Sequence, residues 1–480
     1  MPAPDVVVVG AGLAGLTCAH ALARRGARVI VLAKGLATTH WTAGSIDIAA
    51  PPGAQTSRAG VRRLAEVVGH PYGVLRNDVE PALAELGDLL SAAGLPYLGD
   101  LDSAIRTVPT GIGGTRAVSI LPLSQADAAT PWARDETLIV CGIAGFKDMW
   151  STAVAASLSR PEVWAWPPAR RPQNGLVPVE AQGGVRDDGL APARVVAATA
   201  ELPGIAGRHN LTALHLARAF DQPAWRETAI DAISLAVDGI RPRSAARVAL
   251  PAVLGLRDHG QVLDALRGRL GLPVFELPLV PPSIPGLRLF DALRHALVSA
   301  GVRIQIGESV SRFEGEHRRV GLIATPAAAR EFAVRAGAVV LATGGVAGGG
   351  IVARPEGRLD ESVLGLPVDA APRDDWFSVD PFDLRGHPIE AAGVRTDSQL
   401  RPVTPKGRPV LDNVRIVGSL LAGQHWLRER CGDGVAIASA HRVAVGLSRD
   451  GFAPGPALPA AADSTGAAVA AGSGREWSGR

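Results

Sequence analysis

The segment DVVVVGAGLAG, residues 5–15, decides the fold of this chain. Its four valines form an apolar, β-branched run, which is typical of a strand buried on both faces of a parallel sheet. Gly10, Gly12 and Gly15 follow as G-x-G-x-x-G, and residues 13–24 continue with the apolar spacing of a helix. Such a turn directs backbone N–H groups and the positive end of a helix at a phosphate or pyrophosphate. The segment therefore predicts a nucleotide-type cofactor, against the alternative of a glycine-rich turn without a ligand.

Composition sets the class of protein. With 480 residues the chain exceeds one ordinary hydrophobic core, so we expect two or more lobes. It is 47% hydrophobic and 20% charged, as is usual for globular proteins. Lys and Arg number 49 against 46 Asp and Glu, and no basic run contains interleaved aromatic residues. We therefore expect no nucleic-acid partner.

The cysteines argue against a thiolate-held metal or cluster. Cys18, Cys141 and Cys431 lie far apart without any C-x-x-C, which excludes a self-contained iron–sulfur cluster and a cysteine-rich zinc site. No H-E-x-x-H spacing occurs, so no metal is expected. The first strand begins at about residue 5, which leaves no room for a signal peptide, and no apolar run of about 18 residues is suited to a membrane span. We expect a cytoplasmic chain.

Two β–α–β patterns are visible in the first part of the chain. The first covers residues 5–33, and a second strand–turn–helix–strand pattern covers residues 137–166. The second pattern has only a G-x-x-G, formed by Gly142 and Gly145. Because the full glycine set is absent, we expect a packing turn there and no phosphate cradle.

Two more glycine-rich segments follow buried strands late in the chain. Residues 342–345 read Ala-Thr-Gly-Gly, and residues 413–423 precede Gly-Asp-Gly at residues 432–434. With the first turn, this set resembles the flavoproteins built like fumarate reductase and succinate dehydrogenase. The resemblance implies an α/β fold: a Rossmann-type FAD/NAD(P)-binding domain assembled from N- and C-terminal segments, with an inserted α/β domain. It also implies that the last helix points its positive N-terminus at the flavin edge where reduction places negative charge.

This fold predicts four segments. Residues 1–100 and 331–452 would form the flavin-binding domain, and residues 101–330 the inserted α/β domain. Residues 453–480 are rich in Ala, Gly, Pro and Ser, which predicts a disordered tail.

Other segments resemble a narrower family, the B subunits of the anaerobic glycerol-3-phosphate dehydrogenase. The likeness runs, with gaps, from residue 5 to about residue 445 and includes segments outside the nucleotide motif. The matching segments are HPYGVL (70–75), IVCGIAGFKDM (139–149), PLVPPSIPGLRL (278–289), VLGLPV (363–368), GVRTDSQLRP (393–402), VGSLLAG (417–423) and CGDGVAIASA (431–440).

This resemblance implies one subunit of a quinone-linked complex that oxidises sn-glycerol 3-phosphate to dihydroxyacetone phosphate. In that family a catalytic flavoprotein A subunit pairs with the B subunit. The pair docks on an iron–sulfur C subunit at the membrane, and electrons pass to the quinone pool. The chain would then lie at the inner face of the cell membrane through its partners, without a span of its own. The B subunit is described as carrying FMN, and the A subunit as carrying FAD.

The residues leave the cofactor open between FMN and FAD. A dinucleotide binder usually ends its second strand with an acid that holds the adenosine ribose. Here residues 33–35 read Ala-Lys-Gly, which agrees with FMN; Lys34 could neutralise a phosphate or simply be solvated. The turn at residues 10–15, however, suits a pyrophosphate, which only FAD has. Ser419 stands where many relatives have an acid and would bond a ribityl or ribose hydroxyl more weakly.

Two side chains are candidates for the oxidation chemistry. Hydride removal from a secondary alcohol needs a base for the hydroxyl proton and cations for the phosphate. His40 could be the base or a covalent flavin link, or it could pack against the flavin or a neighbouring loop. Arg288 could hold a phosphate through two bonds, or pair with a nearby carboxylate.

The remaining candidates surround the glycine turns. Asp433, at the start of the last helix, is expected to be its N-cap. The candidate cofactor-binding residues are Gly10, Gly12, Leu13, Ala14, Gly15, Lys34, Gly44, Ser45, Thr343, Gly344, Gly345, Gly418, Ser419, Gly432, Asp433, Gly434 and Val435.

Two alternative functions stay open at this point. One is a self-sufficient flavin oxidoreductase that acts on another small hydroxy or carboxylic acid. The other is a cofactor-free scaffold that keeps the fold for the assembly of a complex, although the intact glycine set argues against it.

Overall fold

The computed structural model describes residues 3–164, 189, 191–205, 207–208, 210–326, 332–381, 383 and 385–452. The chain forms two compact units, which we call unit 1 and unit 2. Unit 1 comprises Met1–Thr38, Val61–Leu89 and Leu293–Arg480, and unit 2 comprises Thr39–Gly60 and Leu90–Ala292.

These units and the predicted domains have different borders. Residues 39–60 cluster with unit 2, and residues 293–330 cluster with unit 1. The division at residues 100 and 330 stays a prediction, and the predicted tail at 453–480 lies outside the described residues.

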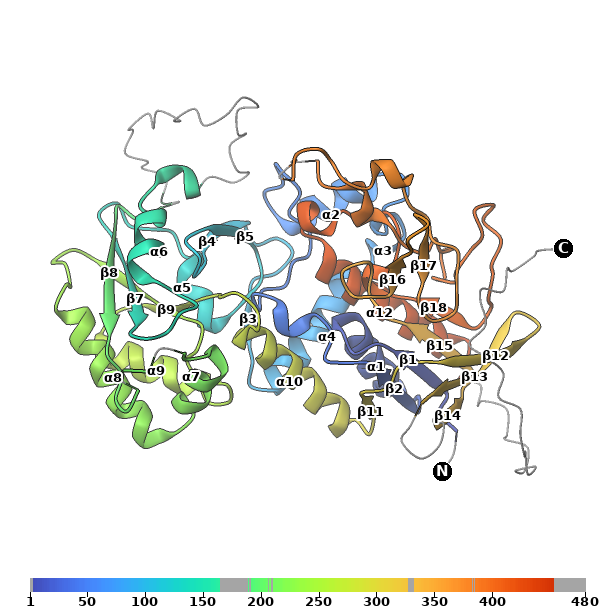
Figure 1. Ribbon diagram of the computed structural model, residues 1–480, viewed down its shortest axis with the longest axis horizontal. Helices are drawn as coiled ribbons and strands as arrows, with labels where there is room; N and C mark the ends of the chain where they lie inside the picture. Colours follow the sequence, from blue (N-terminus) through green and yellow to red (C-terminus); the bar gives the residue numbers. More distant parts are fainter. Residues whose placement is uncertain are drawn as a thin grey trace. The chain divides into compact units, whose positions relative to one another are not determined.

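Unit 1 contains a five-stranded parallel sheet in the order β11-β2-β1-β15-β18 (Figure 1). The central strands are fully buried, which explains their continuous runs of Val, Ile and Leu. Strands from both parts of the chain thus share one sheet, as the sequence predicted. The strands are β1 (Val6–Val9), β2 (Val29–Ala33), β11 (Arg303–Ile306), β15 (Ala338–Leu341) and β18 (Val414–Ile416).

Two helices from opposite parts of the chain pack against each other in unit 1. They are α1 (Leu13–Arg24) and α12 (Gly432–Arg449), and Ala, Gly and Ser on α12 allow close approach. The other helical elements assigned to this unit are α3 (Tyr72–Leu75), η4 (Arg373–Asp375), η5 (Pro388–Ala391), η6 (Gly418–Leu420) and α11 (Trp426–Glu429).

Two small antiparallel sheets complete unit 1. The first is β12 (Arg312–Glu316), β13 (Arg319–Thr325) and β14 (Phe332–Arg335); the second is β16 (Ile351–Ala353) with β17 (Leu359–Glu361). The chain first passes from unit 1 to unit 2 between Thr38 and Thr39. Its later crossings fall within three helices, α2 (Ser57–Ala65), α4 (Val79–Ala92) and α10 (Ile284–Ser299).

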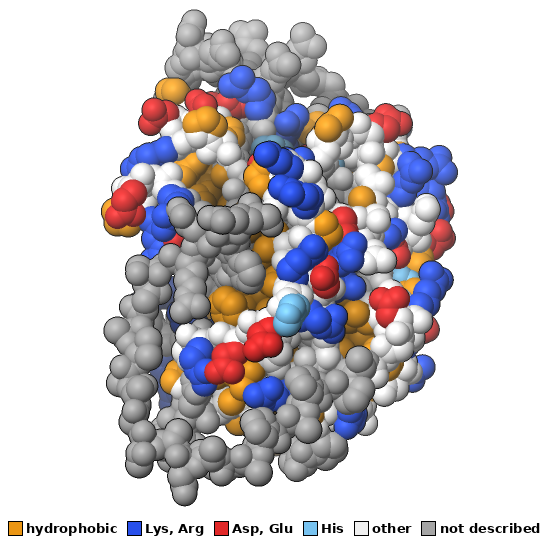
Figure 2. All heavy atoms as spheres, turned by 90° about the vertical axis from the view of Figure 1, so that its right-hand side faces the viewer, with side chains coloured by type: hydrophobic (Ala, Val, Ile, Leu, Met, Phe, Trp, Pro, Cys, Tyr) orange, Lys and Arg blue, Asp and Glu red, His pale blue; other side chains and the backbone are white. Residues whose placement is uncertain are grey.

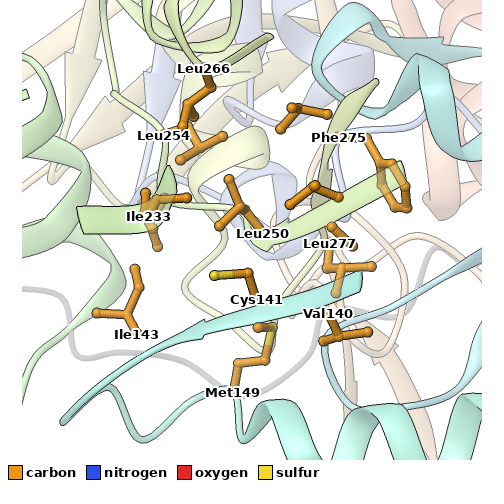
Figure 3. Packing of buried hydrophobic residues seen from close by; sticks show 14 of the residues in the cluster. Val140, Cys141, Ile143, Met149, Ile233, Leu250, Leu254, Leu266, Phe275 and Leu277 are labelled. Atoms are coloured by element: carbon orange, nitrogen blue, oxygen red, sulfur yellow. The ribbon is translucent and has the colours of Figure 1, made fainter. Parts of the chain in front are cut away.

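Unit 2 is built on a four-stranded parallel sheet in the order β10-β9-β7-β8. Its core gathers side chains such as Val140, Cys141, Leu250 and Phe275, all fully buried (Figure 3). The strands are β7 (Thr137–Ile143), β8 (Arg194–Ala200), β9 (Ala246–Pro251) and β10 (Val274–Leu277). The helices are α5 (Ala126–Ala129), α6 (Ser151–Leu158), α7 (Ala213–Phe220), α8 (Pro223–Asp238) and α9 (His259–Leu270).

Unit 2 also contains shorter elements. Two-stranded sheets join β3 (Tyr97–Leu98) to β6 (Leu121–Pro122) and β4 (Arg106–Pro109) to β5 (Thr115–Val118). The 3-10 helices are η1 (Thr39–Trp41), η2 (Leu123–Gln125) and η3 (Pro161–Trp164).

The second β–α–β unit is longer than the sequence predicted. β7 and α6 form as expected, but the residues expected to return as a strand near 160–166 include η3 instead. Trp164 is buried there and donates its indole N–H to Leu158 O at 2.8 Å, which stabilises the turn. The strand that pairs in parallel with β7 is β8.

The surface is mixed in charge. Figure 2 shows one face of the molecule, on which Lys and Arg side chains lie among Asp and Glu side chains. Exposed ion pairs such as Arg318–Asp412 and Arg354–Asp360, both at 2.8 Å, match acids to bases. Over the residues that the structure describes, no helix is long and apolar enough to cross a membrane.

Candidate flavin-binding site

The turn between β1 and α1 depends on two glycines for close backbone contacts. Gly10 has a φ of +117°, and a Cβ there would overlap the carbonyl oxygen of Ala342. A Cβ on Gly15 would overlap the carbonyl oxygen of Gly10. The two glycines therefore bring the end of β1, the start of α1 and the end of β15 into contact.

The middle glycine of the motif, Gly12, has space around it. Gly12 is the N-cap of α1, with extended backbone and no capping side chain, and no acid follows in the first turn. A Cβ added to Gly12 would meet only the Cβ of Ala37, at 3.6 Å. No side chain in the described part of the protein therefore caps the first-turn amides of Leu13, Ala14 and Gly15. The positive end of α1 has space for a phosphate group.

The second turn follows β15 and is linked to the third by Ser419. The N–H of Gly345 donates to Ser419 Oγ at 3.3 Å, and a Cβ on Gly345 would lie 2.7 Å from the carbonyl oxygen of Ser419. Gly344 has a φ of +83°. Thr343 Oγ1 is buried and has no hydrogen-bond partner within the described part of the chain. A buried hydroxyl without a partner fits a position that a polar ligand would complete.

The third turn brings β18 against α1. Gly418 has a φ of +71°, and a Cβ there would lie 2.7 Å from the Cβ of Ala14. Its N–H donates to Ser439 Oγ on α12 at 3.0 Å, and Gln424 Nε2 donates to its carbonyl oxygen at 3.2 Å. All three glycine turns of unit 1 therefore meet around the N-terminus of α1.

The last helix starts one residue earlier than the predicted cap. Cys431 occupies the N-cap position of α12, without a capping side-chain bond, and Asp433 lies in the first turn. Asp433 as N-cap is therefore a wrong prediction, because the helix already includes Gly432. Gly434 and Val435 are buried in the same turn.

A buried carboxylate lies directly before this helix, and no local pattern in the sequence predicts it. Glu429 Oε2 accepts the N–H of His425 at 2.8 Å and lies 3.3 Å from His70 Nε2 and 3.5 Å from Cys431 Sγ. Burial acts to raise the pKa of Glu429, yet the bonds from His70 and His425 hold it below its ordinary value. Burial and the neighbouring Glu429 carboxylate raise the pKa of the Cys431 thiol well above its usual range.

His70, Glu429 and Cys431 also have the composition of a metal site, with ligand atoms within 4.8 Å of one another. However, His70 Nδ1 accepts the backbone N–H of Tyr72 at 3.0 Å. The ring proton therefore sits on Nε2 and faces Glu429, whereas a metal on Nε2 would need the proton on Nδ1. The geometry supports a hydrogen-bonded carboxylate. Two of these residues come from the matching segments HPYGVL and CGDGVAIASA.

The end of β2 carries no acid, and the predicted role of Lys34 at a phosphate stays a prediction. β2 ends at Ala33, and the exposed Lys34 and Gly35 follow without a carboxylate. The usual position for the ribose-binding acid therefore carries no acid in this chain.

His40, Gly44 and Ser45 belong to unit 2, where the loop that contains them packs on Ser283 and on the first turn of α10. The N–H of Ser283 donates to His40 O at 2.8 Å, and Gly44, with a φ of +86°, leaves no room for a Cβ beside Pro285. His40 Nδ1 and Ser45 Oγ are both buried and have no hydrogen-bond partner among the residues that are described. Because these two buried atoms can each still form a hydrogen bond with a ligand, the loop remains a candidate ligand site.

Arg288 is the predicted residue whose surroundings decide between two roles. Its NH1 lies 2.5 Å from Glu276 Oε2, and its NH2 donates to Glu276 Oε1 at 2.9 Å and to Gly255 O at 2.5 Å. Both side chains of the ion pair are buried. Burial acts to raise the pKa of Glu276, but Arg288 lowers it below its ordinary value. The structure shows the ion pair, so we do not assign Arg288 to a phosphate or to catalysis.

Comparisons with known proteins identify the family of this chain. Residues 5–435 match the FAD binding domain family. The B subunit of the anaerobic glycerol-3-phosphate dehydrogenase of Yersinia pestis bv. Antiqua (strain Antiqua) is 31% identical over 92% of this chain and 97% of its own length. The probable B subunit of the same enzyme in Halobacterium salinarum is 30% identical over 91% of this chain and 96% of its own length.

Solved flavoproteins are more distant. The 3-ketosteroid delta1-dehydrogenase of Sterolibacterium denitrificans covers 94% of this chain and is fully covered, with 11% identity and a TM-score of 0.41. FrdA of the E. coli quinol fumarate reductase covers 93% of this chain and is 70% covered, with 10% identity and a TM-score of 0.37. The fold assignment rests on the parallel sheet of unit 1 and on the family match. The chain binds a flavin, is an oxidoreductase, and belongs to the family of anaerobic glycerol-3-phosphate dehydrogenase B subunits.

Proposed function

We propose that this chain binds FAD and acts as the electron-relaying B subunit of a complex that oxidises sn-glycerol 3-phosphate to dihydroxyacetone phosphate. The observation that carries the proposal is the meeting of three glycine turns around the uncapped N-terminus of α1. The names of the relatives supply the substrate and the membership of a multi-subunit complex.

FAD is preferred to FMN because of the space before α1. The amides of Leu13, Ala14 and Gly15 and the open side of Gly12 suit the pyrophosphate of a dinucleotide, a group that FMN lacks. The family match is to an FAD binding domain, which also supports FAD.

The flavin would supply two-electron oxidation at its ring, and this chain's residues would position and polarise it. Thr343 Oγ1 would bond a polar group of the cofactor, because it is buried without a partner from the described residues. The positive N-terminus of α12, at Gly432, would stabilise negative charge on a reduced ring. Glu429 offsets part of that positive potential, because its carboxylate is buried just before the helix.

The partners in this proposal are a catalytic flavoprotein A subunit and an iron–sulfur C subunit that delivers electrons to quinone. The relatives are themselves named as one subunit of an enzyme, which supports a complex. No described helix suits a membrane crossing, so contact of this part of the chain with a membrane would run through partner subunits at its inner face.

Flavin identification and turnover test the proposal together. The chain is purified alone and with its A and C partners, the bound flavin is released and identified by mass, and glycerol 3-phosphate oxidation is followed with a quinone analogue. We expect FAD in the isolated chain and full turnover only in the complex. Full turnover by the isolated chain, or FMN as the extracted flavin, would contradict the proposal.

A self-sufficient oxidoreductase is a second candidate, favoured by one observation in unit 2. His40 Nδ1 and Ser45 Oγ are buried without partners among the described residues, as expected where a small polar substrate binds. Turnover of the isolated chain with a dye acceptor and a panel of small hydroxy and carboxylic acids would support this candidate.

A further inference from the structure

The end of β2 leaves a specific requirement of dinucleotide binding unmet. In Rossmann-type folds a carboxylate after the second strand accepts hydrogen bonds from the adenosine ribose. Here β2 ends at Ala33, and the next two residues are an exposed lysine and a glycine. If the chain binds FAD, another residue must hold the ribose or the ribose is held without an acid.

The neighbouring strand ends at the same point and carries an acid. β11 runs parallel to β2, with Ile306 opposite Ala33. Ala33 O then accepts two N–H groups, from Gly307 at 2.8 Å and from Glu308 at 3.0 Å. Glu308 therefore lies directly beside the end of β2, although the two strands are far apart in the sequence.

The side chain of Glu308 has an unmet hydrogen-bonding requirement. Its Oε2 is buried and has no hydrogen-bond partner in the described part of the protein. A buried carboxylate oxygen without a donor is costly, so such an atom is expected where a ligand supplies the donor. A ribose offers two hydroxyl donors, each suited to a carboxylate oxygen.

The same edge of the sheet carries the proposed pyrophosphate position. β1, β2 and β11 are parallel neighbours, so their carboxyl ends all lie at one edge. Ligands of open parallel sheets bind at that edge. The Gly12 turn follows β1 at this edge and Glu308 follows β11, with the end of β2 between them.

We propose that Glu308 replaces the missing acid of β2 and accepts a hydrogen bond from a hydroxyl of the adenosine ribose. The residue then selects FAD over FMN, because only FAD carries that ribose. This inference rests on the proposed binding of FAD.

Flavin affinity of the apoprotein tests the role of Glu308. Wild type, E308A and E308Q are titrated with FAD and with FMN, and the quenching of flavin fluorescence gives the two dissociation constants. We expect E308A to weaken FAD binding by about 10- to 100-fold, in the range of a lost bond to a charged group, and E308Q to weaken it less. FMN affinity should stay unchanged in both variants. E316A is the matched control, since Glu316 is exposed on β12, and it should bind both flavins as wild type does.

Ribose analogues test the same contact without a mutation. ADP should compete with FAD for the wild-type site, and 2′-deoxy-ADP or 3′-deoxy-ADP should compete about tenfold less well if one of those hydroxyls meets Glu308. Equal competition by all three nucleotides, or equal FAD affinity of E308A and wild type, would overturn the role of Glu308 while leaving FAD binding intact. A wild-type protein that binds FMN but no FAD would instead overturn the proposed FAD function.

Discussion

The two units contain similar turns after a buried parallel strand, and the turns differ in what occupies the space beyond them. At the end of β7, a Cβ on Gly142 would lie 3.0 Å from the side chain of Ser151, whose hydroxyl lies 3.1 Å from Thr199 Oγ1. A Cβ on Gly145 would overlap Arg208 O. After β1, in contrast, Gly12 has only Ala37 near it.

This difference separates a packing turn from a ligand-binding turn. In unit 2 both glycines make room for other protein atoms, so the G-x-x-G is a packing turn, as its incomplete motif predicted. In unit 1 Gly10 and Gly15 serve backbone packing, and Gly12 keeps space free before a helix. The number of glycines alone is therefore less informative than the atoms that a side chain would meet at each of them.

The largest effect is expected from blocking the close contacts in unit 1. Gly10→Val would force a side chain onto the carbonyl oxygen of Ala342 and would strain a φ of +117°. We expect loss of bound flavin and a fall in the free energy of unfolding of about 4–5 kcal/mol. Flavin absorbance and urea denaturation measure both quantities. Gly446→Val, on the exposed side of α12 with no atom near its Cβ, is the control and should keep its flavin.

A somewhat smaller effect is expected from breaking the buried ion pair of unit 2. Arg288→Met would leave Glu276 buried without its cation, which costs about 3–5 kcal/mol of unfolding free energy. Because the ion pair stabilises unit 2 itself, the dissociation constant for flavin should not change. The double variant R288M/E276M should recover much of the lost stability. A large loss of flavin affinity in a folded R288M protein would contradict the structural role.

Two glycine-to-alanine substitutions, one in each unit, give the sharpest test of this comparison. Gly12→Ala should weaken flavin binding by about tenfold or more with little change in stability, because its Cβ meets protein atoms only at 3.6 Å. Gly142→Ala should lower the free energy of unfolding by about 1–3 kcal/mol, because of the 3.0 Å contact with Ser151, and leave flavin affinity unchanged. Equal effects of the two variants on flavin affinity would remove the distinction between the turns.

The smallest effect concerns pH. The pKa of Glu429 is lower in the folded chain than its ordinary value of 4.5, so its contribution to stability is complete above that pH. The contribution is lost as the pH falls through the lower folded value. Glu429→Gln should therefore flatten this part of the acid dependence and cost about 1–3 kcal/mol at neutral pH. Unfolding free energies of wild type, E429Q and the surface control E316Q, measured down to about pH 3, give the comparison. If the unfolding free energy of E429Q depended on acid pH as that of wild type does, this prediction would be contradicted.

The sequence predicted the parts of the fold that follow from local pattern. Valines at residues 6–9 predicted a buried parallel strand, and the order of three glycine segments predicted that distant parts of the chain share one sheet. The partners of buried polar groups were not predictable in this way. Glu276 and Arg288 meet only after β10 and α10 pack, so the sequence could not choose between a phosphate and a carboxylate.

The same reason explains the missed residues around the cofactor site. Glu308 comes beside Ala33 through strand pairing, and His70 comes beside Glu429 through the packing of unit 1. Neither juxtaposition has a spacing that a motif search detects. The returning strand after α6 was also misplaced, because η3 follows the helix and β8 comes only at Arg194–Ala200.

The order of strands in unit 1 has a consequence for synthesis of the protein. β1 and β2 are made first, yet β15 and β18, which complete the sheet on one side, come some hundreds of residues later. At roughly 5–20 residues per second, the ribosome would need on the order of 20–80 s to make the intervening chain. For that time the apolar pair of β1 and β2 is exposed to aggregation or to a chaperone. If α12 contributes to the flavin site as proposed, we expect flavin capture to follow the emergence of α12, and flavin supply to govern how much of the finished chain survives.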